Sequence, residues 1–150
     1  FKENVDYLIS EGLSLSKPMA MKRVDVDNCE RKWNLSFPKD YRTPFFMDDY
    51  TPAVKPTIEQ TTHKNGVLGI EELIINVVEY DYFVNTYKKL TSNYVEENNQ
   101  SYFYFDASCI KLKKADNYHI ENITLLVKED YTFDGKDTHG VTILTKKKSI

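Results

Sequence analysis

The sequence predicts an α+β fold built from repeated βαβββ units with mostly antiparallel sheets. Three observations lead to this prediction. Apolar residues recur at helical spacing in two segments of the chain. Short runs between polar turns alternate between apolar and polar residues, as strands do. These elements occur twice in the same order, and the first copy lacks its opening strand, so the chain is expected to contain an internal repeat.

The first predicted unit covers residues 1–50 and contains one helix and three strands. Phe1, Val5 and Leu8 fall on one face of a helix, and Gly12 is placed to end it. Runs rich in apolar and aromatic residues follow, separated by turns that contain Asp, Asn or Pro. The three strands are expected at residues 18–26, 29–37 and 43–49.

Residues 51–66 are predicted to be a linker, because they hold several polar or proline-marked clusters and no periodicity. The second unit covers residues 67–150 and ends in a truncated further unit. Its expected elements are a strand at 72–78, a helix at 79–90, and strands at 93–97, 101–107, 109–115, 120–130 and 139–148.

The opening strand of the second unit should present two different faces, because successive side chains of a strand point in opposite directions. Leu73, Ile75 and Val77 are expected to lie under the helix at 79–90. Glu72 and Asn76 would then face the other way, toward any groove that the sheet forms.

Composition excludes several classes of partner. The net charge is -3 and charges of both signs are mixed, so we expect neither nucleic acid nor an anionic membrane. No apolar run is long enough to cross a bilayer. Cys29 and Cys109 form neither a CxxC motif nor a disulfide framework, which indicates a reducing, cytoplasmic location. If the chain begins at Phe1, the missing opening strand would leave a free sheet edge, and such edges favour a homodimer.

Three passages resemble the vicinal-oxygen-chelate (glyoxalase/bleomycin resistance/dioxygenase) superfamily, and in particular its glyoxalase-like domain proteins. Residues 19–37 look like that family's strand, turn and strand, with an Arg before the turn and a Trp after it. "PFFMDD" at 44–49 resembles its Pro-Phe-Phe strand that ends in an acid. Residues 69–90 look like the opening strand and helix of a unit, whereas residues 92–150 match only in strand order.

The resemblance implies a paired-unit fold whose curved sheets enclose a cleft. Many members of the superfamily hold a divalent metal there through His and Glu, and the metal polarises a substrate with two adjacent oxygens. At the matching positions this chain has Glu72 in place of the opening-strand His, and Asp48 as the carboxylate. The second unit offers Lys111 and Lys113 where its acid should be. Asp48 and Glu72 are therefore the candidate metal ligands, and a divalent metal is possible although no cofactor is expected.

A simpler interpretation of these acids is that each is exposed, because charged side chains are seldom buried. Asp48 would then end a strand beside Asp49, and Glu72 would be a polar residue at the rim of a groove. His63 and His139, like His119, lack the spacing of a preformed metal site and are expected to be solvated.

Arg23, Trp33 and Asn76 are the candidate contacts for a small-molecule ligand. The guanidinium fork of Arg23 suits a carboxylate or a phosphate, although the same side chain could pair with Asp25 or Asp27 on the surface. Trp33 could line the cleft or belong to the core. Asn76 faces the same groove as Glu72 on the predicted strand.

Two functions remain open from the sequence. The first is a degenerate or partial glyoxalase-like module that binds a small molecule and lacks a complete metal site of its own. The alternative is a metal-dependent enzyme of the lyase, isomerase or dioxygenase type that acts on a vicinal-oxygen substrate. The missing His and the two lysines favour the first for this chain.

Overall fold

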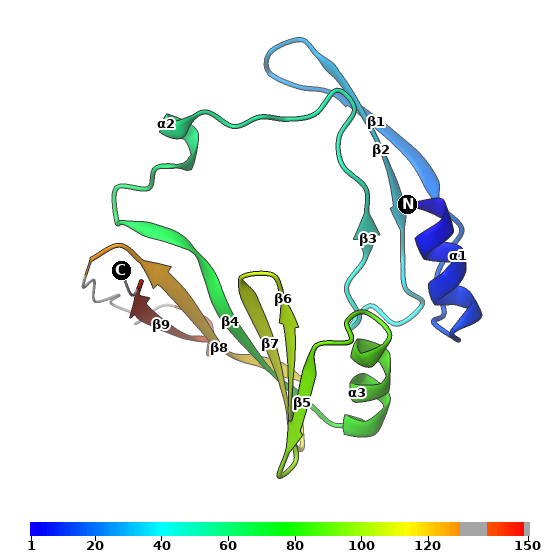
Figure 1. Ribbon diagram of the computed structural model, residues 1–150, viewed down its shortest axis with the longest axis vertical. Coiled ribbons are helices and arrows are strands. Elements are labelled where there is room, and N and C mark those ends of the chain that lie inside the picture. The colour runs from blue at the N-terminus through cyan, green and yellow to red at the C-terminus, as the bar shows by residue number, and fades with distance from the viewer. Residues whose placement is uncertain (130–137, 149–150) are drawn as a thin grey trace. The chain divides into compact units, whose positions relative to one another are not determined.

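The structure is a computed structural model that describes residues 1–129 and 138–148. Residue 130, the last of the predicted strand at 120–130, lies outside the described residues. The chain divides into two compact units, Phe1–Pro56 and Thr57–Ile150, and each is described by itself (Figure 1). The boundaries predicted at residues 50 and 66 stay a prediction.

The first unit contains one helix and a three-stranded antiparallel sheet in the order β1-β2-β3. Its buried apolar side chains are Val5 and Leu8 of the helix and Leu13 just after it. The helical spacing seen in the sequence therefore marks the face that is buried. The elements are α1 (Lys2–Ser10), β1 (Met19–Val24), β2 (Glu30–Ser36) and β3 (Phe46–Met47).

Strand β3 is much shorter than the predicted strand at 43–49, and Asp48 gives the reason. The Asp48 side chain accepts the backbone N–H of Asn34 at 2.6 Å, the place that a backbone carbonyl would take in a continuing ladder. The chain leaves the ladder there and returns to β2 only at Thr51, whose backbone exchanges two hydrogen bonds with Lys32. A side chain thus ends the strand.

The predicted linker holds a short helix, α2 (Ile58–Thr61), which the sequence analysis missed. Thr57 and Gln60 form a capping box, because each side chain bonds the backbone N–H of the other residue. None of the four residues of α2 is buried, so the helix depends on the hydrogen bonds of its capping box. The signal was present in the sequence as Thr-x-x-Gln.

Besides α2, the second unit contains a six-stranded sheet in the order β5-β6-β7-β4-β8-β9 and a nine-residue helix, α3. The pairs β4–β7 and β8–β9 are parallel, and the other three pairs are antiparallel. Strand β4 begins five residues earlier than the predicted 72–78, since its first half pairs with β8. The elements are β4 (Val67–Val77), α3 (Tyr80–Lys88), β5 (Tyr94–Glu97), β6 (Gln100–Phe105), β7 (Ser108–Lys114), β8 (His119–Val127) and β9 (Thr142–Lys147).

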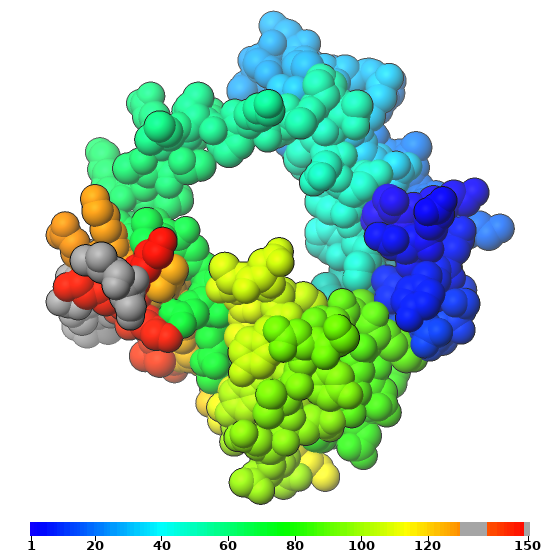
Figure 2. Space-filling model, in the orientation of Figure 1, coloured from blue at the N-terminus to red at the C-terminus, as the bar shows by residue number. Residues whose placement is uncertain are grey.

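The core of the second unit lies between α3 and the sheet. Phe83, Val84 and Tyr87 of α3 pack against the strands, as the helical spacing predicts. Ile75 and Val77 are buried in this core and Leu73 is packed against it, which confirms the face assigned to them. In Figure 2 the atoms of this region, green to yellow, form one continuous packed mass. The strands contribute Phe103 and Leu112 as the remaining fully buried side chains of the cluster.

The fold is therefore a mixed α+β fold with strand-rich sheets and few helices, as predicted, and most of the strand pairs in the described residues are antiparallel. The relation of the two units as repeats of one βαβββ unit stays a prediction. No helix in the described ranges has both the length and the apolar character needed to span a bilayer.

Candidate functional site

Arg23 lies in a small network of charges where the β1–β2 hairpin turns. Its Nε donates to Asp25 Oδ1 at 2.6 Å, so the surface pairing left open by the sequence does occur. Arg31 donates to the other Asp25 oxygen at 3.3 Å and to Asp27 at 2.6 Å. A further bond from Arg31 to the carbonyl of Pro52, at 3.2 Å, fastens the hairpin to the chain after β3.

The guanidinium of Arg23 also makes cation–π contacts with two aromatic rings. Its central carbon lies 5.6 Å from the centre of the Trp33 ring and 5.0 Å from that of Tyr50. The two rings meet edge to face, with their centroids 5.1 Å apart. Cation–π contacts of this kind orient a guanidinium and contribute about 0.5–1 kcal/mol at exposed sites. Arg23 is thus fixed in direction although 52% of its side-chain surface remains exposed.

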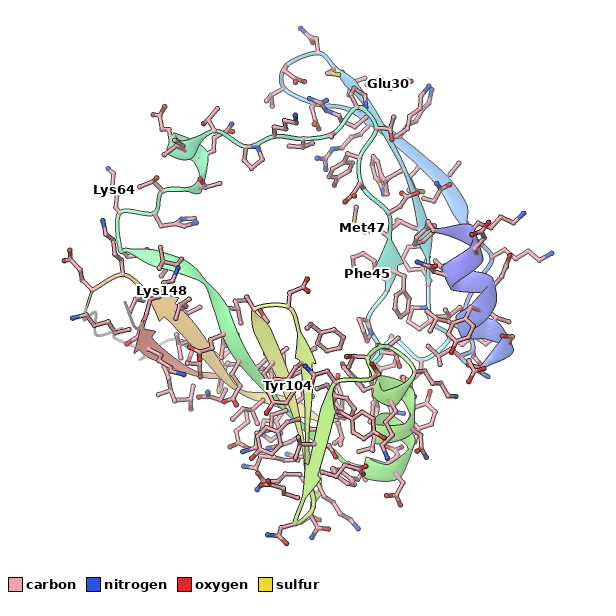
Figure 3. The ribbon with its side chains drawn as sticks, in the orientation of Figure 1. Glu30, Phe45, Met47, Lys64, Tyr104 and Lys148 are labelled. Carbon is pink, nitrogen blue, oxygen red and sulfur yellow. The ribbon has the colours of Figure 1, made fainter. Side chains whose placement is uncertain are left out.

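A hollow of about 350 Å³ lies on the first unit and is lined by Trp33 and Asp48. Trp33 is half-buried, so it serves both as packing and as a wall of the hollow. Lys22 and Lys32 also line it, and both ammonium groups pair with Glu30, which is labelled in Figure 3. The other lining residues are Ala20, Met21, Asn34, Asp49 and Thr51.

Asp48 has a structural role, because both of its carboxylate oxygens bind Asn34. Its two oxygens accept the backbone N–H of Asn34 at 2.6 Å and the side-chain amide of Asn34 at 2.7 Å. Burial alone would raise the pKa of Asp48, but the hydrogen bonds from Asn34 outweigh it and hold that pKa below its usual range. Asp49, by contrast, is exposed. The two adjacent acids therefore have different surroundings.

Asn76 lies in a polar cluster on the sheet of the second unit. Although it is on the face away from the core, its side chain is only 7% exposed. Its amide nitrogen lies 3.1 Å from Nε2 of His119, the residue directly opposite on β8. Lys113 on the other neighbouring strand donates to both Glu121 oxygens at 2.8 Å. The bond from Lys113, followed by the nearby amide of Asn76, lowers the pKa of Glu121.

The sequence analysis missed three members of this cluster. His119 was expected to be solvated, and this was wrong, because the ring is half-buried against Asn76. Lys113 was considered only as a replacement for an acid, and Glu121 was not considered. The alternation along each strand could have placed them on one face, but the register that brings residues 76, 113 and 119 side by side is a tertiary property.

Two atoms of this cluster are buried without a hydrogen-bond partner among the described residues: Asn76 Oδ1 and His119 Nδ1. The Asn76 amide nitrogen can only donate, so Nε2 of His119 accepts from it. The hydrogen of a neutral ring then lies on Nδ1. The cluster consequently holds one unpaired acceptor and one unpaired donor.

Asp48 and Glu72, the residues predicted to hold a metal, belong to different units, and each is described with the neighbours in its own unit. Glu72 lies opposite Cys109 on β7 and Thr124 on β8. Burial, followed by the nearby Glu72 charge, raises the pKa of the Cys109 thiol, and a protonated thiol is a poor ligand. Both Asp48 oxygens are engaged by Asn34. In residues 1–129 and 138–148, His, Cys, Asp and Glu side chains form no group of three or more that could hold a metal.

Comparison with known proteins agrees with this fold. The family model of the glyoxalase-like domain matches residues 2–91. A solved structure titled as a hypothetical protein from Staphylococcus aureus has a TM-score of 0.67 at 16% identity, over 97% of this chain and 62% of that one. This chain therefore spans less than two thirds of that protein. The comparison with curated proteins gives no match. Because the family model covers more than half of the residues, the chain belongs to the glyoxalase-like domain family of the vicinal-oxygen-chelate superfamily.

Proposed function

We propose that this chain is a small-molecule-binding module without a complete metal site of its own, a degenerate or partial member of its family. The observation that carries the proposal is the fixed guanidinium of Arg23, which lies over the ring of Trp33, and Trp33 in turn lines a hollow of about 350 Å³. The site lies wholly within the first unit.

The orientation of Arg23 supports an anionic ligand. Its Nε is engaged by Asp25, whereas the hydrogen bonds that Arg23 makes with described residues leave its two terminal nitrogens unused. A guanidinium presents paired N–H groups at the spacing of two carboxylate or phosphate oxygens. Because Asp25, Trp33 and Tyr50 already fix the side chain, little conformational entropy remains to be lost when an anion binds.

The hollow supports a ligand that also carries an apolar part. Its volume falls within the range of small-molecule pockets, about 300–1,000 Å³. Trp33 and Met21 supply apolar surface, and the paired Lys22 and Lys32 supply polar edges. The best candidate is therefore a small aromatic or aliphatic molecule that bears one carboxylate or phosphate.

Two further features belong to the proposal. Cys29 and Cys109 are free thiols, which suits a reducing compartment such as the cytoplasm. The order strand, helix and three strands over residues 67–114 supports the relation of the two units as βαβββ repeats.

The test uses Trp33, the only tryptophan of the chain, as a fluorescent reporter inside the proposed site. Phenyl phosphate and benzoate are titrated with excitation at 295 nm, beside the uncharged benzamide. We expect the anions to change the emission in a saturable way, and Arg23→Gln to weaken their binding at least tenfold. Arg42→Gln is the matched control, because Arg42 pairs with Asp40 in the same unit. Equal binding of benzamide, or an unaffected Arg23→Gln variant, would refute the anion site.

The metal-dependent enzyme is tested separately by elemental analysis and by calorimetric titration of Mn²⁺, Ni²⁺ and Zn²⁺. A stoichiometric ion that is lost in Asp48→Ala or Glu72→Ala would contradict the metal-free module and support the enzyme. The proposed module predicts no such ion.

A further inference from the structure

Strand β1 forms a free edge of the first unit's sheet. In the part of the chain that the structure describes it pairs only with β2, and all six of its residues are exposed. Its pairing with β2 is regular from Met19 to Val24, without a bulge. An edge of this kind presents unpaired backbone groups to solvent and is a template for another strand.

The backbone hydrogen bonds show which residues of β1 point outward. Lys32 exchanges both of its backbone bonds with Thr51, on the β3 side of β2. Likewise, the Asn34 carbonyl accepts the N–H of Asp48 on that side. In an antiparallel ladder the residues opposite them, Lys22 and Ala20, must then turn their own N–H and C=O groups away from β2. These groups are the free donors and acceptors of the edge.

The usual protections of an edge strand are weak in β1. It contains neither Pro nor Gly, and its two cations are neutralised within the same unit. Lys22 pairs with Glu30 at 3.3 Å, and Arg23 pairs with Asp25 at 2.6 Å. Both cations of β1 therefore have a partner in their own unit, although two lysines placed directly opposite each other would still be unfavourable. The β5 edge of the second unit differs, because that strand has only four residues and ends in two glutamates.

We propose that β1 pairs with β1 of a second copy, antiparallel and about a two-fold axis at Met21. Residues whose backbone N–H and C=O groups point away from β2 must lie opposite each other across the new pair of strands. Ala20 of one copy therefore lies opposite Lys22 of the other and exchanges backbone hydrogen bonds with it. Met21 then faces Met21 of the second copy in a non-hydrogen-bonded pair. Two three-stranded sheets become one continuous sheet of six strands, with the same contacts on both sides of the axis.

The choice of register follows from charge on one side and from Pro18 on the other. A shift by two residues in one direction also satisfies the backbone, but it would place Lys22 directly opposite Lys22 of the second copy, and like charges in that position are unfavourable. A shift in the other direction would place Pro18, which has no N–H to donate, opposite Lys22. The Met21-centred register places the small side chain of Ala20 there instead. It also places Met21, which is 37% exposed, opposite Met21 of the second copy on the face that carries Trp33 and Leu35. Met19, which is 44% exposed on the same face, then lies opposite Arg23 of the second copy.

The first measurement is the mass of the full chain in solution by light scattering, from low to high micromolar concentration. We expect a dimer, twice the chain mass of 17.6 kDa, with a concentration-dependent fraction of monomer. Ala20→Pro removes an outward N–H without touching the ladder to β2, so it should give a monomer that keeps the far-ultraviolet circular dichroism of the folded wild type. A wild-type protein that stays monomeric throughout, or a folded Ala20→Pro variant that stays dimeric, would overturn the proposal.

Cysteine cross-linking tests the register even if the proline variant fails to fold. In a background with Cys29 and Cys109 replaced by Ser, Met21→Cys should form an intermolecular disulfide under mild oxidation, because non-hydrogen-bonded pairs bring Cα atoms to about 4.5 Å. Lys22→Cys is the matched control one residue away and should cross-link far more slowly. Faster cross-linking of Lys22→Cys would overturn the Met21-centred register. This dimer does not depend on ligand binding, so its failure leaves the anion site untouched.

Discussion

Replacing Asp48 with Ala should destabilise the first unit, and replacing the adjacent Asp49 with Ala should not. Asp48 is half-buried and accepts two hydrogen bonds from Asn34, one from its backbone at 2.6 Å and one from its side chain at 2.7 Å. Asp49 is exposed and has no hydrogen bond or ion pair with the described residues. The two variants remove the same charge from neighbouring positions. The difference between their free energies of unfolding therefore isolates the hydrogen bonds between Asp48 and Asn34.

The expected magnitude follows from the type of bond. A hydrogen bond to a charged group contributes about 1.5–3 kcal/mol when it is buried. Because Asp48 and Asn34 are half-buried, water can replace part of each bond in the variant. We therefore expect a loss of about 2 kcal/mol for the two bonds together. Asp49→Ala should stay within about 0.5 kcal/mol, as surface substitutions usually do.

The assay is urea unfolding followed by the emission of Trp33, which lies in the first unit and so reports on that unit even if the second unfolds separately. With a slope of about 1 kcal/mol per M, the midpoint of Asp48→Ala should fall by about 2 M. The pKa of Asp48 is lowered in the folded state. The stability that Asp48 contributes to folding is therefore fully present above the unfolded pKa, about 3.9, and is lost as the pH falls through the lower folded pKa. Equal urea midpoints for the two variants at pH 7 would refute the stabilising role of the two Asn34–Asp48 hydrogen bonds. So would a difference between the midpoints that does not become smaller in acid.

Further predictions concern the second unit. Phe103→Ala should cost about 3–5 kcal/mol, because this ring is fully buried and packs 5.3 Å from Tyr87 and 5.9 Å from Tyr94, centre to centre. Near-ultraviolet circular dichroism during thermal unfolding measures the loss, and a cost under about 1 kcal/mol would contradict the core assignment. Burial raises the pKa of Tyr87 to about 12, so folding loses stability as the pH rises from the unfolded value near 10 toward 12. Tyr87→Phe should remove this loss, and alkaline unfolding curves that coincide with those of the wild type would show that Tyr87 is not its source.

Local patterns predicted the elements that depend on local spacing. The apolar stripe of α3 and the alternation of Leu73, Ile75 and Val77 identified the core of the second unit, since both follow from the geometry of a helix and a strand. The strands of the first hairpin were placed to within two residues. The end of β3 was missed, because a side-chain acceptor stops the ladder and no periodicity shows that.

Candidate site residues were predicted with less success, because their roles depend on partners distant in the sequence. Arg23 and Trp33 were identified by resemblance, but only the fold places Tyr50 against the same guanidinium. Asp48 was weighed as a metal ligand, whereas its partner is Asn34 on the neighbouring strand. Their binding of a ligand stays a prediction.

The sequence by itself determined the class of the fold, the family and the faces of the main helix and strand, because these depend on residue order and spacing within short segments. The tertiary structure alone decided which polar groups meet. Asn76 and His119 are 43 residues apart and face each other only through the register between β4 and β8. A shift of one residue in that register would turn His119 to the opposite face of the sheet. Register depends on the packing of the whole sheet, which no single stretch of the sequence contains.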